Sequence, residues 1–287
     1  MKIILSVITA FVLFASSACA ADWKTLADEA IGLLPPAVAD LENKKDKSES
    51  DVYALTVIYY REYHHGKLKK LYTDHEKKMP ESVVLKMLNG IILLREHRHR
   101  ECGVLLRAMV REHPEFYPAL IMLAHSNYLQ KDFAGAYALA RRLIDKKKEL
   151  SRYHYAVSLL LAAGSKGIIA KNNLTQAIPA YFEVNRYLKE TAKLMPDSPE
   201  VFYGQGSYHL LTPTVAGGDI DLAIKMLEKS RQLTPQNTQV YVRLAQAYRF
   251  KGDIPAYRKN IARALEIDPQ DEVLLDYLSG EKVFLEQ

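Results

Sequence analysis

The chain has 287 residues, of which 48% are hydrophobic and 25% are charged. This balance excludes disorder as the main state, because enough apolar surface is present to form a core. Two cysteines exclude a disulfide scaffold, and a formal charge of +5 gives no indication of nucleic-acid binding, so no nucleic-acid partner is expected.

The first twenty residues have the pattern of an export signal. A basic start precedes the apolar run from Ile3 to Ala15, which is shorter than the roughly 20 residues that span a bilayer. Ala18 and Ala20 then form a small-x-small cleavage motif. Residues 1–20 are therefore expected to be a secretory signal peptide, which predicts an exported, periplasmic protein.

Cys19 leaves a second interpretation open, namely a lipoprotein signal whose cysteine is lipidated and anchors the chain to the membrane. Lipoprotein signals resemble one another in carrying Leu or Val three positions earlier, where this chain has Ser16. Cleavage after Ala20 is favoured, and membrane attachment is expected only if Cys19 is lipidated. Cys102 is then the remaining thiol and is expected to be buried in a helix.

Residues 21–48 are expected to contain one helix and a polar loop. The helical pattern runs from Trp23 to Leu34 and ends at two consecutive prolines. The run from Glu42 to Asp51 is polar and charged, which predicts a flexible loop with the next helix beginning near Ser50.

A period of 34 residues runs through the rest of the chain. Pro80 and Pro114 are 34 residues apart, as are Pro235 and Pro269, and each follows an apolar helical pattern. The period predicts an array of paired helices over residues 49–271. Its six units are expected at 49–82, 83–116, 117–150, 151–198, 199–237 and 238–271.

Small residues occupy the eighth position of each unit, which supports this division. They are Thr56, Gly90, Ala124, Ser158, Gly206 and Ala245. In the last unit, Gly252 is expected to end the first helix with a positive φ angle, and Asp253 to cap the second.

A 34-residue period of paired helices resembles the tetratricopeptide repeat (TPR) family. The last unit resembles the family throughout, at Tyr241, Leu244, Ala245, Tyr248, Gly252, Asp253, Ala264 and Pro269. The resemblance implies an all-α fold: a right-handed superhelical solenoid of about six TPR hairpins with N- and C-terminal capping helices. Residues 272–287 are expected to be the C-terminal capping helix.

Two insertions interrupt the period in adjacent units. Residues 164–173 are expected to lengthen the link between the helices of unit four, and residues 211–215 interrupt unit five. Insertions in a solenoid often gather on its binding face, which favours a shared site, with harmless loops as the alternative.

The TPR resemblance implies that the first helix of each unit lines a concave groove. The residues at the groove positions are mainly aromatic and aliphatic, and tyrosine combines a large ring with a hydroxyl group that can bind a ligand. The candidate binding residues are Tyr53, Tyr60, Met87, Ile91, Ile121, His125, Tyr128, Tyr155, Leu159, Tyr203 and Leu210.

This groove favours an apolar peptide, a partner helix or a small apolar ligand. TPR domains that bind C-terminal carboxylates use Lys, Asn and Arg, which the fifth and ninth positions of these units lack. Binding of an acidic peptide end in that manner is not expected. The alternative left open is that a tightly wound superhelix buries these side chains as plain core.

The sequence contains no motif for catalysis or for cofactor binding, so the chain is not expected to be an enzyme or to hold a cofactor. His97 and His99 lie two residues apart on an expected helix, where they would not share a face. No metal site is therefore expected. Residues 164–167 resemble a phosphate loop only faintly and are expected to be a flexible link.

Residues 210–237 are similar to the periplasmic TPR components associated with TRAP-type solute transporters. The similarity rests on Pro213, Gly217, Gly218, Asp219, Ala223 and Pro235. It implies docking with a periplasmic solute-binding protein and a hydrophobic ligand inside the superhelix. The expected function is an exported scaffold for a protein partner in the cell envelope, as a transporter accessory. The alternative is a carrier of a small apolar ligand.

Overall fold

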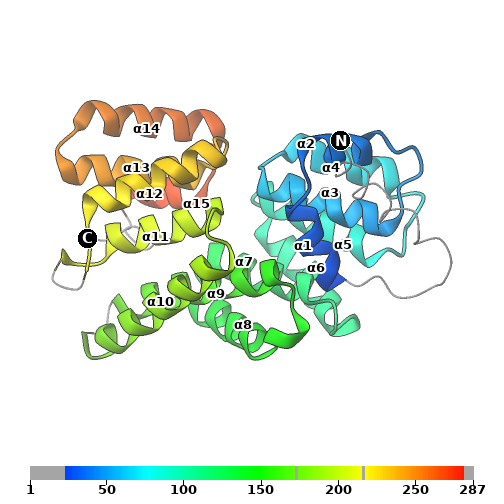
Figure 1. Cartoon of the computed structure of the whole chain (residues 1–287), viewed down its shortest axis with the longest axis horizontal. Coiled ribbons are helices and arrows are strands. Elements are labelled where there is room, and N and C mark those ends of the chain that lie inside the picture. The colour runs from blue at the N-terminus through cyan, green and yellow to red at the C-terminus, as the bar shows by residue number, and fades with distance from the viewer. Residues whose placement is uncertain (1–22, 172–173, 215–216, 281–287) are drawn as a thin grey trace, which may run out of the picture.

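The chain folds into α-helices that pack as successive antiparallel pairs (Figure 1). The computed structural model describes residues 23–171, 174–214 and 217–280, and within these ranges it contains fifteen α-helices, one short 3-10 turn and no strand. The expected all-α class is confirmed. The expected signal peptide, residues 1–20, and with it Cys19, lies outside the described residues.

Six hairpins form the body of the solenoid, and each expected unit contains one of them. They are α3–α4 (Glu49–Arg61, His65–His75), α5–α6 (Val83–Arg95, His99–Glu112), α7–α8 (Tyr117–Leu129, Phe133–Asp145), α9–α10 (Arg152–Lys171, Leu174–Leu194), α11–α12 (Pro199–Leu211, Ile220–Leu233) and α13–α14 (Thr238–Lys251, Ile254–Ile267). α1 (Trp23–Ile31) and α2 (Pro35–Asn43) precede them, and α15 (Glu272–Ser279) follows.

Local capping determines where many helices begin and end. Ser48 and Asp51 form a reciprocal capping box at the start of α3. Gly252 ends α13 at a φ angle of 81°, and the Asp253 carboxylate accepts a hydrogen bond from the Ala256 amide at 2.9 Å, as expected.

Small residues allow the two helices of a hairpin to cross closely. A Cβ atom on Gly206 would lie 2.7 Å from the Cγ atom of Leu227, and one on Gly90 would lie 3.1 Å from a methyl group of Leu106. Cys102 is fully buried beside Gly90, whose carbonyl accepts a hydrogen bond from its thiol, and its expected burial is confirmed.

The N-terminal segment differs from the expectation of one helix and a loop. The first helix ends at Ile31, and Pro35 and Pro36 then begin a second helix, α2, that extends to Asn43. Proline lacks an N–H group and has a helical φ angle, so it fits the first turn of a helix as well as it ends one.

The insertion in unit four also differs from its expectation. Residues 164–171 are not a loop, because they continue α9, so that α9 and α10 are 20 and 21 residues long. Residues 172–173 lie outside the described part of the chain.

Although α9 and α10 are long, none of the helices in the described ranges combines the length and the apolarity of a membrane span.

The solenoid curves so strongly that its two arms meet. In Figure 1, α1–α6 and α11–α15 lie on opposite sides and α7–α10 join them. α1 also packs against the middle of the chain, where the Asp28 carboxylate accepts hydrogen bonds from the Arg152 and Tyr153 amides at the start of α9, both at 2.8 Å. Lys131 Nζ lies 2.6 Å from Asp276 Oδ1 on α15, which ties α15 to the middle of the chain.

Candidate functional site

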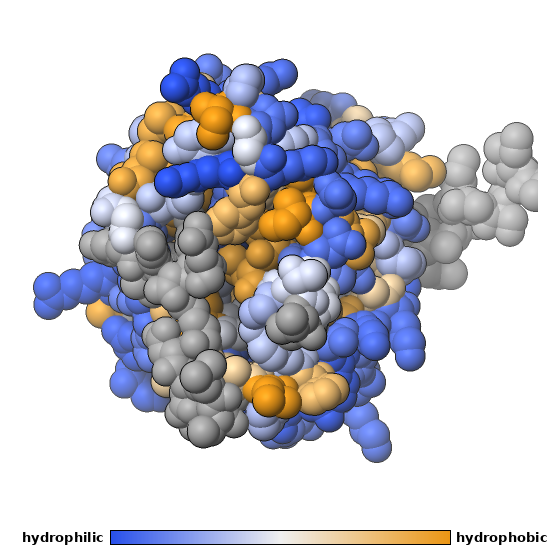
Figure 2. Space-filling view, turned by 90° about the vertical axis from the view of Figure 1, so that its left-hand side faces the viewer, coloured by the Kyte–Doolittle hydropathy of each residue, from blue (hydrophilic) through white to orange (hydrophobic). Residues whose placement is uncertain are grey.

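The first helices of the six hairpins surround a cavity of about 850 Å³. This volume lies within the range of roughly 300–1,000 Å³ that is typical of small-molecule sites. Figure 2 shows apolar side chains gathered in a hollow between hydrophilic ones, on the side of the molecule where α11–α15 lie. The concave groove of the repeat is thus a pocket between the chain's own two arms, and it opens to the surface on this side.

Eight of the eleven candidate binding residues line this cavity. They are Tyr53, Tyr60, Met87, Ile91, Ile121, His125, Tyr128 and Tyr203. Tyr53, Met87, Ile91 and Ile121 are buried, whereas the other four are partly exposed. The structure brings together residues from three successive hairpins and from α11, and their role in binding stays a prediction.

The other three candidates, Tyr155, Leu159 and Leu210, do not line the cavity, which corrects the expectation that they face the groove. The Tyr155 hydroxyl donates to Glu190 Oε1 at 2.8 Å, and Tyr155 and Leu159 are both buried in the core cluster that α7, α8, α9 and α10 form. Leu210 packs on α12 beside Leu227, and its neighbour Leu211 reaches the cavity instead.

In unit four, the side of α9 that faces the cavity differs from the side that the repeat positions predict. On α9 the cavity is lined by Tyr153, Val157, Leu160 and Leu161 among others, so that Tyr155 lies two residues from its nearest lining residues on either side in this set. Two residues turn an α-helix by about 200°, so Tyr155 and Leu159 point to the opposite side.

Two tyrosine–histidine pairs form polar sites in the wall. Tyr53 Oη lies 3.1 Å from His154 Nε2, and Tyr60 Oη lies 2.8 Å from His125 Nδ1. Burial lowers the pKa of each imidazole to about 4. Both histidines are therefore neutral at pH 7, and neither supplies charge to the cavity.

Positive charge in the cavity comes from three arginines, Arg61, Arg95 and Arg243. None of them occupies the fifth or ninth position of its unit, so the inspection of those positions did not find them. Arg61 and Arg95 are each the thirteenth residue of their units, and this recurrence is the signal that could have found them. Arg61 pairs with Glu200, which also lines the cavity.

Arg95 and Arg243 are only partly satisfied. The Arg95 guanidinium lies over the rings of Tyr63 and Tyr60, at 4.1 and 4.9 Å from their centroids, and donates to the Tyr60 carbonyl at 3.1 Å. Arg243 is 3% exposed, and its hydrogen bond to Gln246 is long, at 3.4 Å. The Nε atoms of both arginines are buried without a hydrogen-bond partner among the described residues.

The lining therefore suits an amphipathic molecule. Aromatic and aliphatic side chains can bury an apolar body, and planar guanidinium groups bind carboxylates, sulfonates and phosphates through paired N–H donors. An anion that reached Arg95 or Arg243 would satisfy buried N–H groups that otherwise cost free energy.

The histidines that were expected to lie apart on a helix are in fact close together. His97 is not helical, since it lies in the turn between α5 and α6 at a φ angle of 59°, and His99 is the first residue of α6. Contrary to the expectation, the two histidines therefore lie on the same side, and the helical spacing does not separate them.

Known structures with a similar fold are TPR proteins. The chain is similar to a thermophilic TPR protein of Thermus thermophilus, with a TM-score of 0.55 and 18% identity over 68% of this chain and 97% of that one. A TPR protein of Parabacteroides merdae gives a TM-score of 0.50 and 13% identity over 92% and 99%. The expected helical-repeat solenoid is confirmed.

A chain of the Cut9–Hcn1 hetero-tetramer of the APC/C has a TM-score of 0.61 and 17% identity over 92% of this chain. This chain spans 49% of that larger one. No family model matches the sequence, and no curated protein matches it. At these identities the similarity shows the fold alone.

Proposed function

We propose that this protein is a non-enzymatic binding protein that holds a small amphipathic anion inside its superhelix. The observation that carries the proposal is a pair of arginines, the partly buried Arg95 and the buried Arg243, in a cavity otherwise lined mainly by apolar and tyrosine side chains. Each has a buried Nε–H group without a partner among the described residues, and a buried cation is stable only when it is paired or hydrogen-bonded. A ligand with an anionic group would supply that partner.

The cavity walls support the same ligand class. Tyr60 and Tyr63 hold the Arg95 guanidinium by stacking, so less side-chain entropy is lost when an anion binds. Aliphatic residues of several helices, including Met87 and Ile121, offer the apolar surface for the rest of the molecule.

A pair of fluorescent probes tests this proposal. 1-Anilinonaphthalene-8-sulfonate is an apolar anion, and N-phenyl-1-naphthylamine has a similar apolar body without the sulfonate. The full-length protein is expected to bind the anionic probe more tightly. R95Q or R243Q should weaken binding of the anionic probe by about tenfold, the effect of one charge-assisted hydrogen bond, and leave the neutral probe unaffected.

The matched control is R107Q, which removes an arginine that does not line the cavity. Equal affinities for the two probes, or equal losses in the cavity variants and the control, would contradict the proposal. The proposal also predicts that native mass spectrometry of the protein purified from its own host shows one acidic molecule bound per chain.

A second candidate function is docking of a protein partner at the edge of the cavity. Ile178 and Phe182 lie one turn apart on α10, and they are 66% and 74% exposed. Ile178 also lines the cavity. Exposed apolar pairs of this kind often mark a protein interface. We propose that the chain acts in the cell envelope, as a periplasmic scaffold that receives a solute-binding protein of a transporter.

Co-purification from cell envelopes tests the second candidate. One protein partner in a fixed ratio is expected with the unaltered chain and should be lost with I178S/F182S. L233S is the control, because Leu233 is 51% exposed on α12 and does not line the cavity. Retention of the partner by I178S/F182S would exclude this surface.

A further inference from the structure

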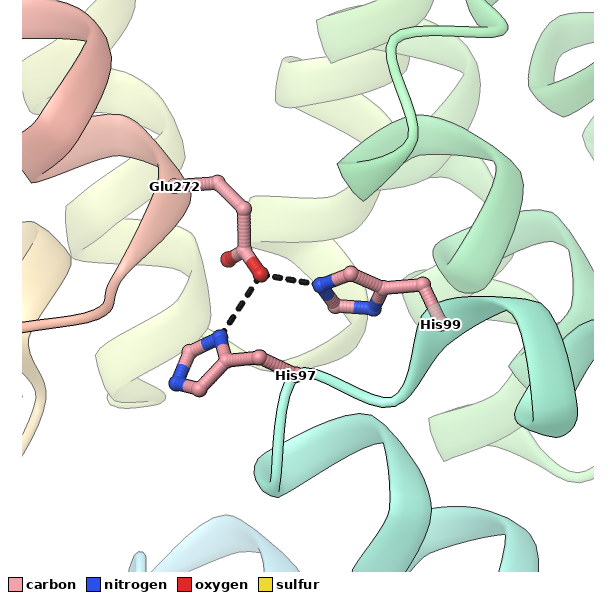
Figure 3. Close-up of side chains that lie close together, drawn as sticks. All are labelled: His97, His99 and Glu272. Carbon is pink, nitrogen blue, oxygen red and sulfur yellow. Dashed lines mark hydrogen bonds and ion pairs between the residues drawn. The ribbon is translucent and has the colours of Figure 1, made fainter.

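The α5–α6 turn meets the start of α15 through three side chains that point toward one another (Figure 3). His97 Nδ1 lies 2.7 Å from Glu272 Oε1, and His99 Nε2 contacts the same oxygen. One ligand atom from each residue lies within 4.8 Å of the other two. Two imidazole nitrogens and one carboxylate thus converge on one small volume.

We propose that His97, His99 and Glu272 bind one divalent transition-metal ion, for which Zn²⁺ is the best fit. Zn²⁺ prefers imidazole nitrogen and carboxylate oxygen in a tetrahedral arrangement, and three protein ligands leave the fourth position for water. Ca²⁺ and Mg²⁺ prefer sites built of oxygen atoms alone, so two histidines disfavour them.

The surroundings of His97 match those of a metal ligand. Its second nitrogen, Nε2, lies 3.2 and 3.1 Å from the two oxygens of the Asp268 carboxylate. Such a carboxylate orients the imidazole ring, and with Nε2 carrying the proton it leaves the Nδ1 lone pair for the metal. Asp268 is thus a positioning residue outside the ligand set.

The site is sheltered and yet open to an ion. The side chains of His97, His99 and Glu272 are 19%, 16% and 18% exposed. Partial desolvation strengthens the attraction between a cation and a carboxylate, and the remaining exposure provides an entry path.

A metal ion here would join parts of the chain that are far apart in sequence. His97 and Glu272 are separated by 175 residues, and they belong to the two arms that lie on opposite sides in Figure 1. The ion would therefore cross-link the two arms of the superhelix on either side of the cavity. It would stabilise this arrangement more strongly as the concentration of the ion rises.

Hydrogen bonds between the two imidazoles and the two carboxylates could hold this cluster together without a metal ion. The experiment therefore has to measure binding of the metal itself. The full-length protein is treated with EDTA, dialysed and titrated calorimetrically with ZnCl₂. One Zn²⁺ per chain is expected. H99Q and E272Q should each weaken binding by at least about 100-fold, and D268N by about 10–100-fold, as for an outer-sphere carboxylate.

H113Q is the matched control, because His113 is exposed and lies away from the site. Circular dichroism checks that each variant folds without metal. Co²⁺ provides a second readout, since tetrahedral coordination gives strong visible absorption that H99Q should abolish. Absence of saturable Zn²⁺ binding, or binding that H99Q and E272Q leave unchanged, would overturn the proposal.

Discussion

The Arg61 guanidinium on α3 donates to both oxygens of the Glu200 carboxylate on α11, with Nε–Oε1 at 2.7 Å and Nη2–Oε2 at 3.2 Å. The two residues are 139 positions apart, and both line the cavity. Burial acts to raise the pKa of Glu200, but the hydrogen bond and charge of Arg61 outweigh it, so that its pKa lies below the ordinary value. The pair ties the first hairpin to the fifth across the enclosed space.

Removing one member of this pair should destabilise the closed superhelix. E200Q is expected to lower the free energy of unfolding by about 1.5–3 kcal/mol, because it removes a charge-assisted hydrogen bond and leaves Arg61 without its counter-charge. Urea unfolding at pH 7 measures the change. E101Q breaks an exposed pair at the start of α6 and should leave stability unchanged. Equal effects of both variants would show that the bridge between the arms adds nothing.

The hairpin crossing in unit five should not tolerate a larger residue at position 206. G206L is expected to cost about 1–3 kcal/mol or more, because even the first added carbon would lie 2.7 Å from Leu227. G167A is the control, since a methyl group on Gly167 of α9 meets nothing within 4 Å. It should be neutral, or stabilising by up to about 1 kcal/mol through higher helix propensity. An unchanged melting temperature for G206L would falsify the assigned crossing.

Stability should fall as the pH drops from 6.5 toward 4, because His154 is buried and neutral. Its pKa is about 4 in the folded chain and 6.5 as the ordinary value, so in this window the unfolded chain binds the extra proton. Burial causes the shift, and the nearby Asp28 charge opposes it only partly. The contribution amounts to at most about 3 kcal/mol, present in full above pH 6.5.

H154Q tests this dependence, because an amide keeps a hydrogen bond to Tyr53 without titrating. The variant should lose less stability than the unaltered chain between pH 6.5 and 4, as measured by urea unfolding at several pH values. H113Q, at an exposed histidine, should follow the unaltered chain. If H154Q lost as much stability as the unaltered chain between pH 6.5 and 4, protonation of His154 would not be the cause of the loss.

Tyr203 and Tyr155 should differ in their effects on ligand binding, although their positions in the repeat are equivalent in sequence. Y203A is expected to weaken binding of 1-anilinonaphthalene-8-sulfonate by at least about fivefold, since it removes an aromatic wall of the cavity. Y155A should leave the affinity unchanged and lower the melting temperature instead, because its ring packs between α8, α9 and α10. If Y155A weakened probe binding and Y203A did not, Tyr155 would face the cavity, as the 34-residue period predicts.

The N-terminus of the protein purified from its own host would distinguish the two interpretations of residues 1–20. Intact mass spectrometry of the protein from its own host should show a chain that begins at Ala21, as expected after cleavage at Ala20. A chain that begins at a lipidated Cys19 would instead establish a membrane anchor. A chain that retains residues 1–20 would contradict export through either route.

Much of the fold could be predicted because its determinants are local. The Gly252–Asp253 pair ends one helix and caps the next through contacts within a few residues, and Gly206 is small because a neighbouring helix of the same hairpin crosses there. The small residue recurs at the same position of every unit, and none of these signals needs knowledge of distant parts of the chain. They account for the all-α class and for the order of the hairpins.

The site was predictable only where the repeat kept its phase. Tyr53, Met87 and Ile121 share the fifth position of regular units, and all three line the cavity. In unit four the residue at the same position, Tyr155, does not line the cavity. A small error in phase there turns every side chain away from its expected face, because an α-helix rotates by about 100° per residue.

By itself, the sequence determined that six hairpins follow one another, that a small residue lies at each crossing, and that Gly252 and Asp253 end one helix and cap the next, since these features depend on residues close along the chain. Only the tertiary structure decided that the groove closes into a cavity and that Arg61 meets Glu200. It alone also decided that His97 and His99 lie against Glu272. The physical reason is that the curvature of a solenoid is the sum of small rotations between successive hairpins, and contacts between its two ends follow from that sum.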